Sequence, residues 1–183
     1  MRQGRVPVAH RLDVDPACDL LVAADELAAD AVERTRRNHP GIVFETDLEE
    51  SVVQGVPASI ERAIANLLDN AAKWSPAGGE VEVRVRNGEV SVRDHGPGID
   101  AADRPYVFDR FYRASSARGM PGSGLGLAIV KQVAESHGGE VTAEASEGGG
   151  TRMSLRLDGR ALSRSGSPKP SPHNLRFFGG TSA

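Results

Sequence analysis

The stretch NLLDNAAKWSP, residues 66–76, ends an amphipathic helix and gives it an unusual polar face. At about 100° per residue, Asn66, Asn70 and Lys73 project within about 60° of one another. Asparagine is a poor helix former and costs free energy when it is buried without a partner. The apolar residues of the same segment cluster on the opposite side, at Ile60, Ile64, Leu67, Leu68 and Ala71. The pattern predicts a helix over residues 57–74 that packs on a core through one face and presents two amides and an ammonium on the other.

That polar face has two interpretations. An amide oxygen is a good ligand for Mg²⁺, and a lysine binds phosphate as a point charge. Alternatively, the face is solvated, and Lys73 interacts with the helix dipole near the C-terminus of the helix. The helix alone does not distinguish the two interpretations. The other motifs of the chain are needed to choose between them.

The composition of the 183-residue chain is that of an ordinary globular protein, with 39% hydrophobic residues and a formal net charge of −3. This charge argues against broad binding to nucleic acids or anionic membranes, which requires a basic balance. The single cysteine, Cys18, excludes an internal disulfide. No apolar run reaches the roughly 18 residues that span a bilayer, and the N-terminus lacks the apolar region of a signal peptide. We therefore expect a cytoplasmic chain that does not itself contact a membrane.

Hydrophobic periodicity and turn signals divide the chain into helices and strands. Helical patterns cover residues 19–38, 57–74 and 126–137, and alternating strand patterns cover residues 42–48, 80–86, 89–94, 140–146 and 151–157. Asn87-Gly88 predicts a hairpin with a type I′ turn. Three segments are irregular: a linker or lead-in at residues 1–18, a long loop at residues 95–124 and a disordered tail at residues 159–183. Because the order of the predicted helices and strands lacks a repeated βαβ unit, it predicts an α+β fold with one sheet covered by helices on one face.

A carboxylate ends one strand of this hairpin, in the stretch VSVRDHGPGID, residues 90–100. Asp94 shares the inward parity of Val90 and Val92, so it continues the buried face just as the strand ends. A buried carboxylate there can accept a hydrogen bond from an exocyclic amine such as adenine N6, whereas it would face the O6 acceptor of guanine. It therefore favours ATP over GTP. The following glycines equally suit a simple Asp-x-Gly-x-Gly turn.

Three glycines lead directly into the last helix, in the stretch GMPGSGLGLAIVK, residues 119–131. Gly122, Gly124 and Gly126 suit either the cradling of phosphate on helix N-terminal amides or a flexible hinge. The spacing G-x-G-x-G without a preceding apolar strand does not fit a dinucleotide fingerprint, and no P-loop sequence occurs.

Two further motifs complete the set. In VFDRFYR, residues 107–113, the aromatic side chains would anchor a mobile segment and leave Arg110 and Arg113 to reach a polyphosphate. Gly150-Thr151 opens the last strand, where a hydroxyl could complete a hydrogen-bond pair around a base or a β-bulge could form.

In this order and spacing, the five motifs resemble those of the ATP-binding catalytic domain of sensor histidine kinases, in the GHKL ATPase superfamily. The resemblance covers the domain at residues 19–158. The similar motifs are Asn66-x-x-x-Asn70-Ala-x-Lys73 (N box), Asp94-x-Gly96-x-Gly98 (G1 box), Phe108-Asp109-Arg110-Phe111 (F box), Gly122-x-Gly124-x-Gly126 (G2 box) and Gly149-x-Thr151 (G3 box). The resemblance implies a two-layer α/β sandwich of the Bergerat type, with a mixed sheet of about five strands under three helices and a mobile ATP lid over residues 99–122.

The resemblance also implies roles for individual residues. Asn70 is the implied Mg²⁺ ligand, Asp94 the implied contact of the adenine amine, and Arg110 the candidate for reaching the γ-phosphate. The implied catalytic set is Asn66, Asn70, Lys73 and Arg110. The implied ATP-binding set is Asn66, Asn70, Lys73, Trp74, Asp94, Gly96, Gly98, Ile99, Gly122, Ser123, Gly124, Leu125, Gly126, Leu127 and Thr151. Trp74 stands where relatives often have tyrosine, and its indole could line the adenine site.

The acceptor histidine of the family lies on a helical hairpin that precedes this domain, and none of the five histidines here has that context. The resemblance therefore implies transfer of the γ-phosphate of Mg-ATP to a histidine on a separate or missing dimerisation domain, in cis or in trans. A response regulator would act downstream. The chain is either part of a larger, membrane-anchored sensor kinase or a subunit of a split kinase. We expect a monomer, because dimerisation in this family belongs to the hairpin.

Two other functions stay open. An anti-sigma-factor-type serine kinase belongs to the same superfamily and is naturally free-standing. This superfamily often has a glutamate four residues before the metal-binding asparagine, whereas this chain has Asn66 at that position. A nucleotide-gated binding module would bind ATP and a partner without transferring phosphate.

Overall fold

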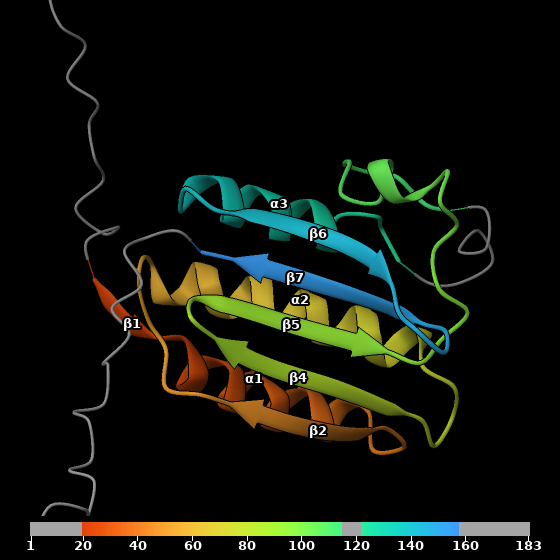
Figure 1. The fold of residues 1–183 in the computed structure, drawn as a ribbon, viewed down its shortest axis with the longest axis horizontal. Helices are drawn as coiled ribbons and strands as arrows, with labels where there is room; N and C mark the ends of the chain where they lie inside the picture. The colour runs from red at the N-terminus through yellow and green to blue at the C-terminus, as the bar shows by residue number, and fades with distance from the viewer. Residues whose placement is uncertain (1–19, 115–121, 158–183) are drawn as a thin grey trace, which may run out of the picture.

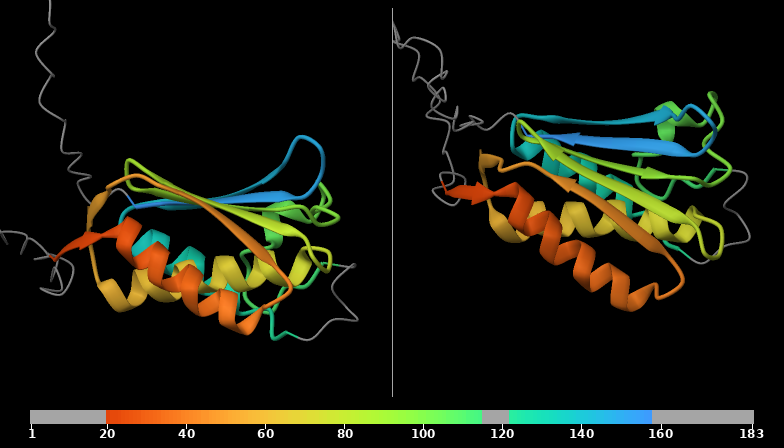
Figure 2. Two further views of the ribbon diagram at one scale, coloured as in Figure 1. Left: turned by 90° about the horizontal axis from the view of Figure 1, so that it is seen from below. Right: turned by 60° about the horizontal axis from the view of Figure 1, so that its bottom comes forward.

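A computed structural model describes residues 20–114 and 122–157. Within these residues the chain forms two layers, a five-stranded sheet and three helices that cover one of its faces (Figures 1 and 2). The helices are α1 (Ala24–Asn38), α2 (Pro57–Trp74) and α3 (Gly126–Ser136). The strands of the sheet are β2 (Val43–Leu48), β4 (Glu80–Arg86), β5 (Glu89–Asp94), β6 (Glu140–Ala145) and β7 (Thr151–Arg156). The predicted two-layer sandwich is confirmed, whereas the lead-in at residues 1–18 and the tail at residues 159–183 lie outside the described part.

The sheet is mixed and runs in the order β2-β4-β5-β7-β6. Only its β2–β4 pair is parallel, among the described strands, and the other three pairs are antiparallel. The chain passes from β2 to β4 through α2, because parallel neighbours need a crossover connection. This crossover brings the C-terminal end of α2 to the edge of the sheet at which β4 begins and β5 ends (Figure 1).

The core lies between the inward face of the sheet and the apolar face of α2. The valines at alternate positions of β4 and β5 point inward and are at most 2% exposed, at Val81, Val83, Val85, Val90 and Val92. The apolar face of α2 meets them through Ile60, Ile64, Leu67 and Leu68, each at most 1% exposed. The division of α2 into an apolar and a polar face is thus as predicted from its periodicity. Among the described residues, no helix combines the length and apolarity needed to cross a membrane.

The helix predicted over residues 19–38 is wrong at its N-terminal end. Helix α1 begins at Ala24, and the preceding strand β1 (Leu21–Ala23) pairs antiparallel with β3 (Val52–Gln54) in a separate two-stranded sheet. Backbone hydrogen bonds continue this pairing at both ends, from Ala24 to Ser51 at 2.8 Å and from Gly55 to Leu20 at 2.8 Å. Periodicity missed both strands because a three-residue segment is too short to show a period that separates a strand from a helical turn.

The hairpin between β4 and β5 turns as its sequence predicts. Asn87 and Gly88 both have positive φ angles, 49° and 80°, as a type I′ turn requires. The flanking residues Arg86 and Glu89 pair directly across the two strands. This register places Asp94 opposite Val81, on the inward face and at the end of the sheet.

We expect Gly139→Ala to lower the free energy of unfolding by about 3 kcal/mol, at the upper end of the usual cost of overpacking. A Cβ at Gly139 would clash with the carbonyl oxygen of Arg156, so the start of β6 would have to move away from β7. Urea denaturation measures the change. The matched control is Gly41→Ala, where a Cβ meets nothing within 4 Å and stability should change little. Equal effects of the two substitutions would contradict the assigned β6–β7 geometry.

Candidate functional site

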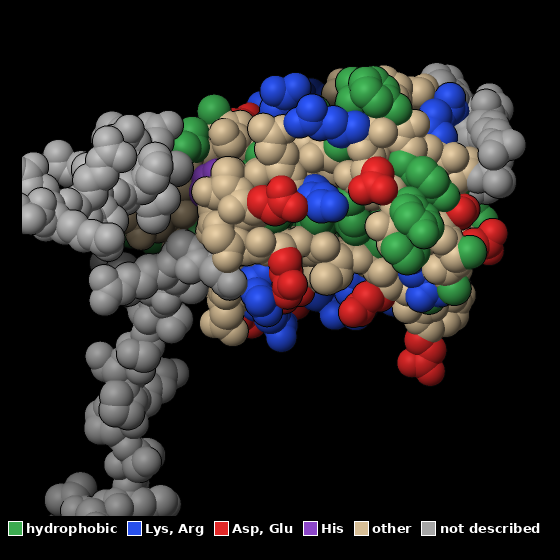
Figure 3. Space-filling model, turned by 90° about the horizontal axis from the view of Figure 1, so that it is seen from above, with side chains coloured by type: hydrophobic (Ala, Val, Ile, Leu, Met, Phe, Trp, Pro, Cys, Tyr) green, Lys and Arg blue, Asp and Glu red, His purple; other side chains and the backbone are tan. Residues whose placement is uncertain are grey.

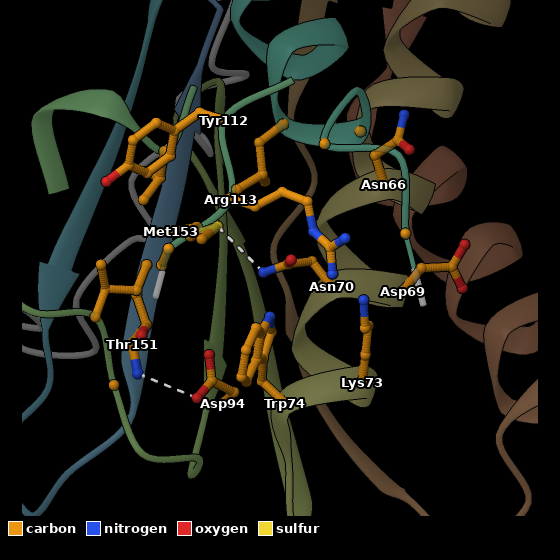
Figure 4. A pocket seen from close by; sticks show the side chains of 18 of the residues that line it. Asn66, Asp69, Asn70, Lys73, Trp74, Asp94, Tyr112, Arg113, Thr151 and Met153 are labelled. Atoms are coloured by element: carbon orange, nitrogen blue, oxygen red, sulfur yellow. Dashed lines mark hydrogen bonds between the residues drawn. The ribbon is translucent and has the colours of Figure 1, made fainter. Parts of the chain in front are cut away.

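A cavity of about 370 Å³ opens at the end of the sheet where β5 ends and β7 begins (Figure 4). Its walls come from α2, the start of α3, the loop after β5 and the inward residues of β7. Most residues of the predicted ATP-binding set line it: Asn66, Asn70, Lys73, Trp74, Asp94, Gly98, Ile99, Gly122, Ser123, Gly124, Gly126, Leu127 and Thr151. Segments that are far apart in the chain, from Asn66 on α2 to Thr151 on β7, therefore share one concave surface.

The polar face of α2 lies against the glycine-rich segment. The Asn66 amide donates from Nδ2 to the Arg62 carbonyl oxygen at 2.9 Å, and its Oδ1 lies 3.1 Å from the position that a Cβ on Gly126 would occupy. Lys73 Nζ lies 3.0 Å from the corresponding position at Gly122. Both glycines thus let the backbone approach a polar side chain closely. In this arrangement the two amides and the ammonium line a cavity wall, which the solvated-face interpretation did not anticipate.

The carboxylate of Asp94 is a buried polar group at one end of the cavity, with 4% of the residue exposed. Its Oδ1 accepts a hydrogen bond from the Gly96 N–H at 2.9 Å. It also accepts one from the Thr151 N–H at 3.2 Å (Figure 4). Burial raises the pKa of this carboxyl above 3.8, although both N–H donors and nearby His95 act in the opposite direction. Gly96 therefore supports the site through Asp94 without lining the cavity.

The raised pKa of Asp94 predicts how stability depends on pH. Because the folded state binds this proton more tightly than the unfolded state, the contribution to stability is present at acid pH and is lost as pH rises from 3.8 through the higher pKa of the folded state. We expect wild-type protein to lose stability relative to Asp94→Asn across this window. Urea denaturation at several pH values measures the difference, and a difference that shrinks with rising pH would contradict the assignment.

Asn70 presents its oxygen to the cavity. Its Nδ2 donates to the sulfur of Met153 at 3.8 Å, so Oδ1 is the end of the amide that remains for a ligand (Figure 4). Mg²⁺ takes oxygen ligands and in phosphate sites usually has only one or two from the protein, with phosphate oxygens and water completing its shell. The donor set at this end of the cavity therefore fits Mg²⁺ bound together with a polyphosphate.

The segment between β5 and α3 carries the two arginines that were predicted to reach a polyphosphate. Arg113 lines the cavity, and its guanidinium points toward Asn70 in Figure 4. Arg110 does not line it; it is exposed, and its guanidinium lies 3.5 Å from Gln132 on α3. The backbone between them is held by a hydrogen bond from Phe111 N to the Gly124 carbonyl oxygen at 3.0 Å. The structure thus brings Arg113, not the preferred Arg110, to the other site residues.

The outer surface of this segment is apolar. Tyr106 and Phe111 are 52% and 71% exposed, and Figure 3 shows hydrophobic side chains on the surface at this end of the molecule. Tyr112 is fixed beneath it by a hydrogen bond from its hydroxyl to Asp103 at 2.6 Å. The central part of the expected lid, residues 115–121, lies outside the described residues.

Several cavity residues were not predicted as site residues: Asp69, Pro97, Val107, Tyr112, Arg113, Ala114 and Met153. Met153 had a signal, because it shares the inward parity of Thr151 on β7. Arg113 had the same signal as Arg110, and spacing alone could not separate them. Leu125, which was predicted, lies at the N-cap position of α3 and does not line the cavity.

The two ends of the cavity have different chemistry. At one end, a carboxylate can accept a hydrogen bond from a ligand amine, beside the apolar side chains of Ile99, Trp74 and Met153. At the other end, Lys73, Arg113 and the start of α3 can bind an anion, and Asn70 can bind its cation. An amphiphilic ligand with an amino-bearing ring and a polyphosphate matches both ends.

Comparison with known proteins agrees with this description. Residues 55–161 match the model of the family described as histidine kinase-, DNA gyrase B- and HSP90-like ATPases, which is more than half of the chain. The chain belongs to this ATPase family. Its similar solved structures include histidine kinase ATP-binding domains, so the predicted GHKL fold is confirmed.

Within the ATPase family, the chain is similar to mycobacterial sensor kinases. A signal transduction histidine-protein kinase/phosphatase, MprB of Mycobacterium avium, is 48% identical over 149 residues, which are 76% of this chain and 28% of that protein. A solved structure of a mycobacterial sensor histidine kinase MprB has a TM-score of 0.70 and 44% identity, and the match covers 75% of this chain and 97% of that one. The ATP-binding domain of PrrB from Mycobacterium tuberculosis has a TM-score of 0.61 and 28% identity, over 76% and 96% of the two chains. The chain thus spans about 28% of the length of the curated Mycobacterium avium relative.

Proposed function

We propose that this chain binds Mg-ATP and transfers its γ-phosphate to a histidine on a dimerisation and phosphoacceptor domain, as the catalytic part of a two-component sensor kinase. The observation that carries the proposal is the single cavity that gathers the motifs of α2, β5, α3 and β7 in a member of this ATPase family. Its volume of about 370 Å³ lies within the usual range for small-molecule sites. A response regulator would receive the phosphate next.

The adenine ring would bind at the Asp94 end. The carboxylate Oδ1 is already occupied by two backbone N–H groups, so the second oxygen can accept from the exocyclic amine of adenine. Guanine carries an oxygen at the equivalent position and would be repelled. The indole of Trp74 and the side chain of Ile99 supply apolar contact for the ring.

Phosphoryl transfer depends mainly on positioning and on neutralising the charge of the transferred group. Lys73 and Arg113 lie where they can bind phosphate oxygens, and Asn70 can bind the cation. When bound, Mg²⁺ would neutralise part of the phosphate charge. Asn66 would hold the loop before α3 close to the phosphates through its contact with Gly126. The attacking imidazole belongs to the acceptor domain, which would approach past the exposed Tyr106 and Phe111.

We expect Arg113→Ala to weaken ATP binding by about tenfold and Arg110→Ala to change it by less than about twofold. A charge-assisted hydrogen bond to phosphate accounts for an effect of this size. Isothermal titration calorimetry with ATP measures the difference. Adenosine, which has no phosphate, is the control ligand, and its affinity should change in neither variant. A larger loss of ATP affinity in Arg110→Ala than in Arg113→Ala would instead support Arg110 as the residue that reaches the γ-phosphate.

Phosphate transfer itself is tested by mixing the chain with radiolabelled Mg-ATP and a helical hairpin that carries the acceptor histidine of a sensor histidine kinase. We expect label on the hairpin that is lost in acid and retained in base, as for phosphohistidine. Label with the opposite stability would indicate a serine kinase. ATP binding without any label transfer would support a nucleotide-gated binding module and overturn the kinase proposal.

A further inference from the structure

Met153 lines the cavity beside the amide of Asn70 (Figure 4). It faces inward from β7 and is 3% exposed. The Asn70 amide donates from Nδ2 to the Met153 sulfur at 3.8 Å, which is within hydrogen-bond range for sulfur. The contact joins residues 83 positions apart in the chain, so no local sequence signal could place it.

We propose that Met153 is a positioning residue that orients the Asn70 amide so that its oxygen faces the divalent cation. The inference rests on the proposed function, because it assumes that Mg-ATP occupies the cavity. Met153 itself touches neither the cation nor the reacting phosphate. It acts only through Asn70.

The physical reason is the asymmetry of an amide. One end has two N–H donors and the other an oxygen with two lone pairs. A thioether sulfur accepts hydrogen bonds weakly and donates none, so it favours the N–H end of the amide and repels the oxygen end. Because Mg²⁺ binds oxygen ligands, an amide turned the other way presents no ligand to it. An apolar side chain of the same volume would remove this preference of the sulfur for the N–H end.

Strand β7 would then orient both ends of the site. Thr151 donates its backbone N–H to Asp94, and Met153, the next inward residue, accepts from Asn70. Strand β7 lies between β5 and β6 and pairs with both, so its backbone is held on each side. One rigid strand therefore sets the carboxylate for the ring and the amide for the cation at a fixed separation.

The test is Met153→Leu, which keeps the volume and removes the sulfur. The affinity for ATP is measured by the fluorescence of Trp74, the only tryptophan of the chain, with Mg²⁺ and with EDTA. Mutation of a residue that hydrogen-bonds a metal ligand typically lowers metal affinity about 10- to 100-fold. Because sulfur is a weak acceptor, the effect here should lie at or below the lower end of that range. We expect Met153→Leu to weaken ATP binding about three- to tenfold in Mg²⁺ and to leave binding in EDTA unchanged. Leu155→Met, a swap of similar size at the next inward position of β7, is the matched control and should change neither affinity.

A double-mutant cycle with Asn70→Asp isolates the contact. A carboxylate has no N–H to orient, so Met153→Leu should have no further effect on Mg²⁺-dependent binding when it is combined with Asn70→Asp. Equal losses in Mg²⁺ and in EDTA, no loss at all, or the same loss in both backgrounds would overturn the positioning role. Failure of the wild-type chain to bind ATP under either condition would instead overturn the proposed function.

Discussion

Asp94→Asn should weaken adenine-nucleotide binding roughly 100-fold while the domain stays folded. The asparagine oxygen can still accept from the N–H groups of Gly96 and Thr151, so the hydrogen bonds within the protein are retained. Its amide nitrogen, however, would face the adenine amine with a donor instead of an acceptor. Losing a hydrogen bond to a charged group and leaving a buried donor unpaired costs about 3 kcal/mol, or roughly a 100-fold loss of affinity.

Trp74 fluorescence and calorimetry measure this loss, and urea denaturation checks the fold. The matched control is Asp100→Asn, at an exposed aspartate of the loop after β5, which should bind ATP as the wild type does. Asp94→Asn should also be at least as stable as the wild type near neutral pH, because burial raises the pKa of Asp94 and makes its charge costly there. Wild-type affinity for ATP in Asp94→Asn would refute the proposed orientation of the nucleotide.

Asn70→Ala should reduce phosphate transfer by about 100- to 1,000-fold, the usual cost of removing one group that stabilises the charge of a transition state. The substitution removes the amide oxygen at the cavity, the opposite end of the amide from the N–H group that contacts Met153. ATP binding in EDTA should change little, since the adenine and phosphate contacts of the other residues remain. Radiolabel transfer to the acceptor hairpin at saturating Mg²⁺ measures the effect.

Asn38→Ala is the matched control for this substitution, because Asn38 is an exposed asparagine at the end of α1 and does not line the cavity. It should transfer phosphate at the wild-type rate. Circular dichroism should show equal helix content in both variants, because Asn70 lies on the polar face of α2 and outside the core. Undiminished transfer by Asn70→Ala would show that the cation is held elsewhere.

Much of the fold follows from local patterns in the sequence. The alternation of Val81, Val83 and Val85, the Asn87-Gly88 turn and the apolar face of α2 each act over a few residues, and the structure confirms all three. The strands β1 and β3 escaped prediction because a three-residue segment forms a strand only when a partner strand is present. Their pairing is a tertiary event.

The candidate site divides in the same way. The sequence by itself determined which side chains are candidates for nucleotide binding, because the motifs around Asn70, Asp94 and Gly124 have a fixed order and spacing. Only the tertiary structure decided that Arg113 and not Arg110 lines the cavity, and that Met153 contacts Asn70. Both outcomes depend on how a loop and a distant strand pack against α2. The sequence gives the residue types and their local periodicity. Contacts between distant segments form only when the sheet and the helices pack together.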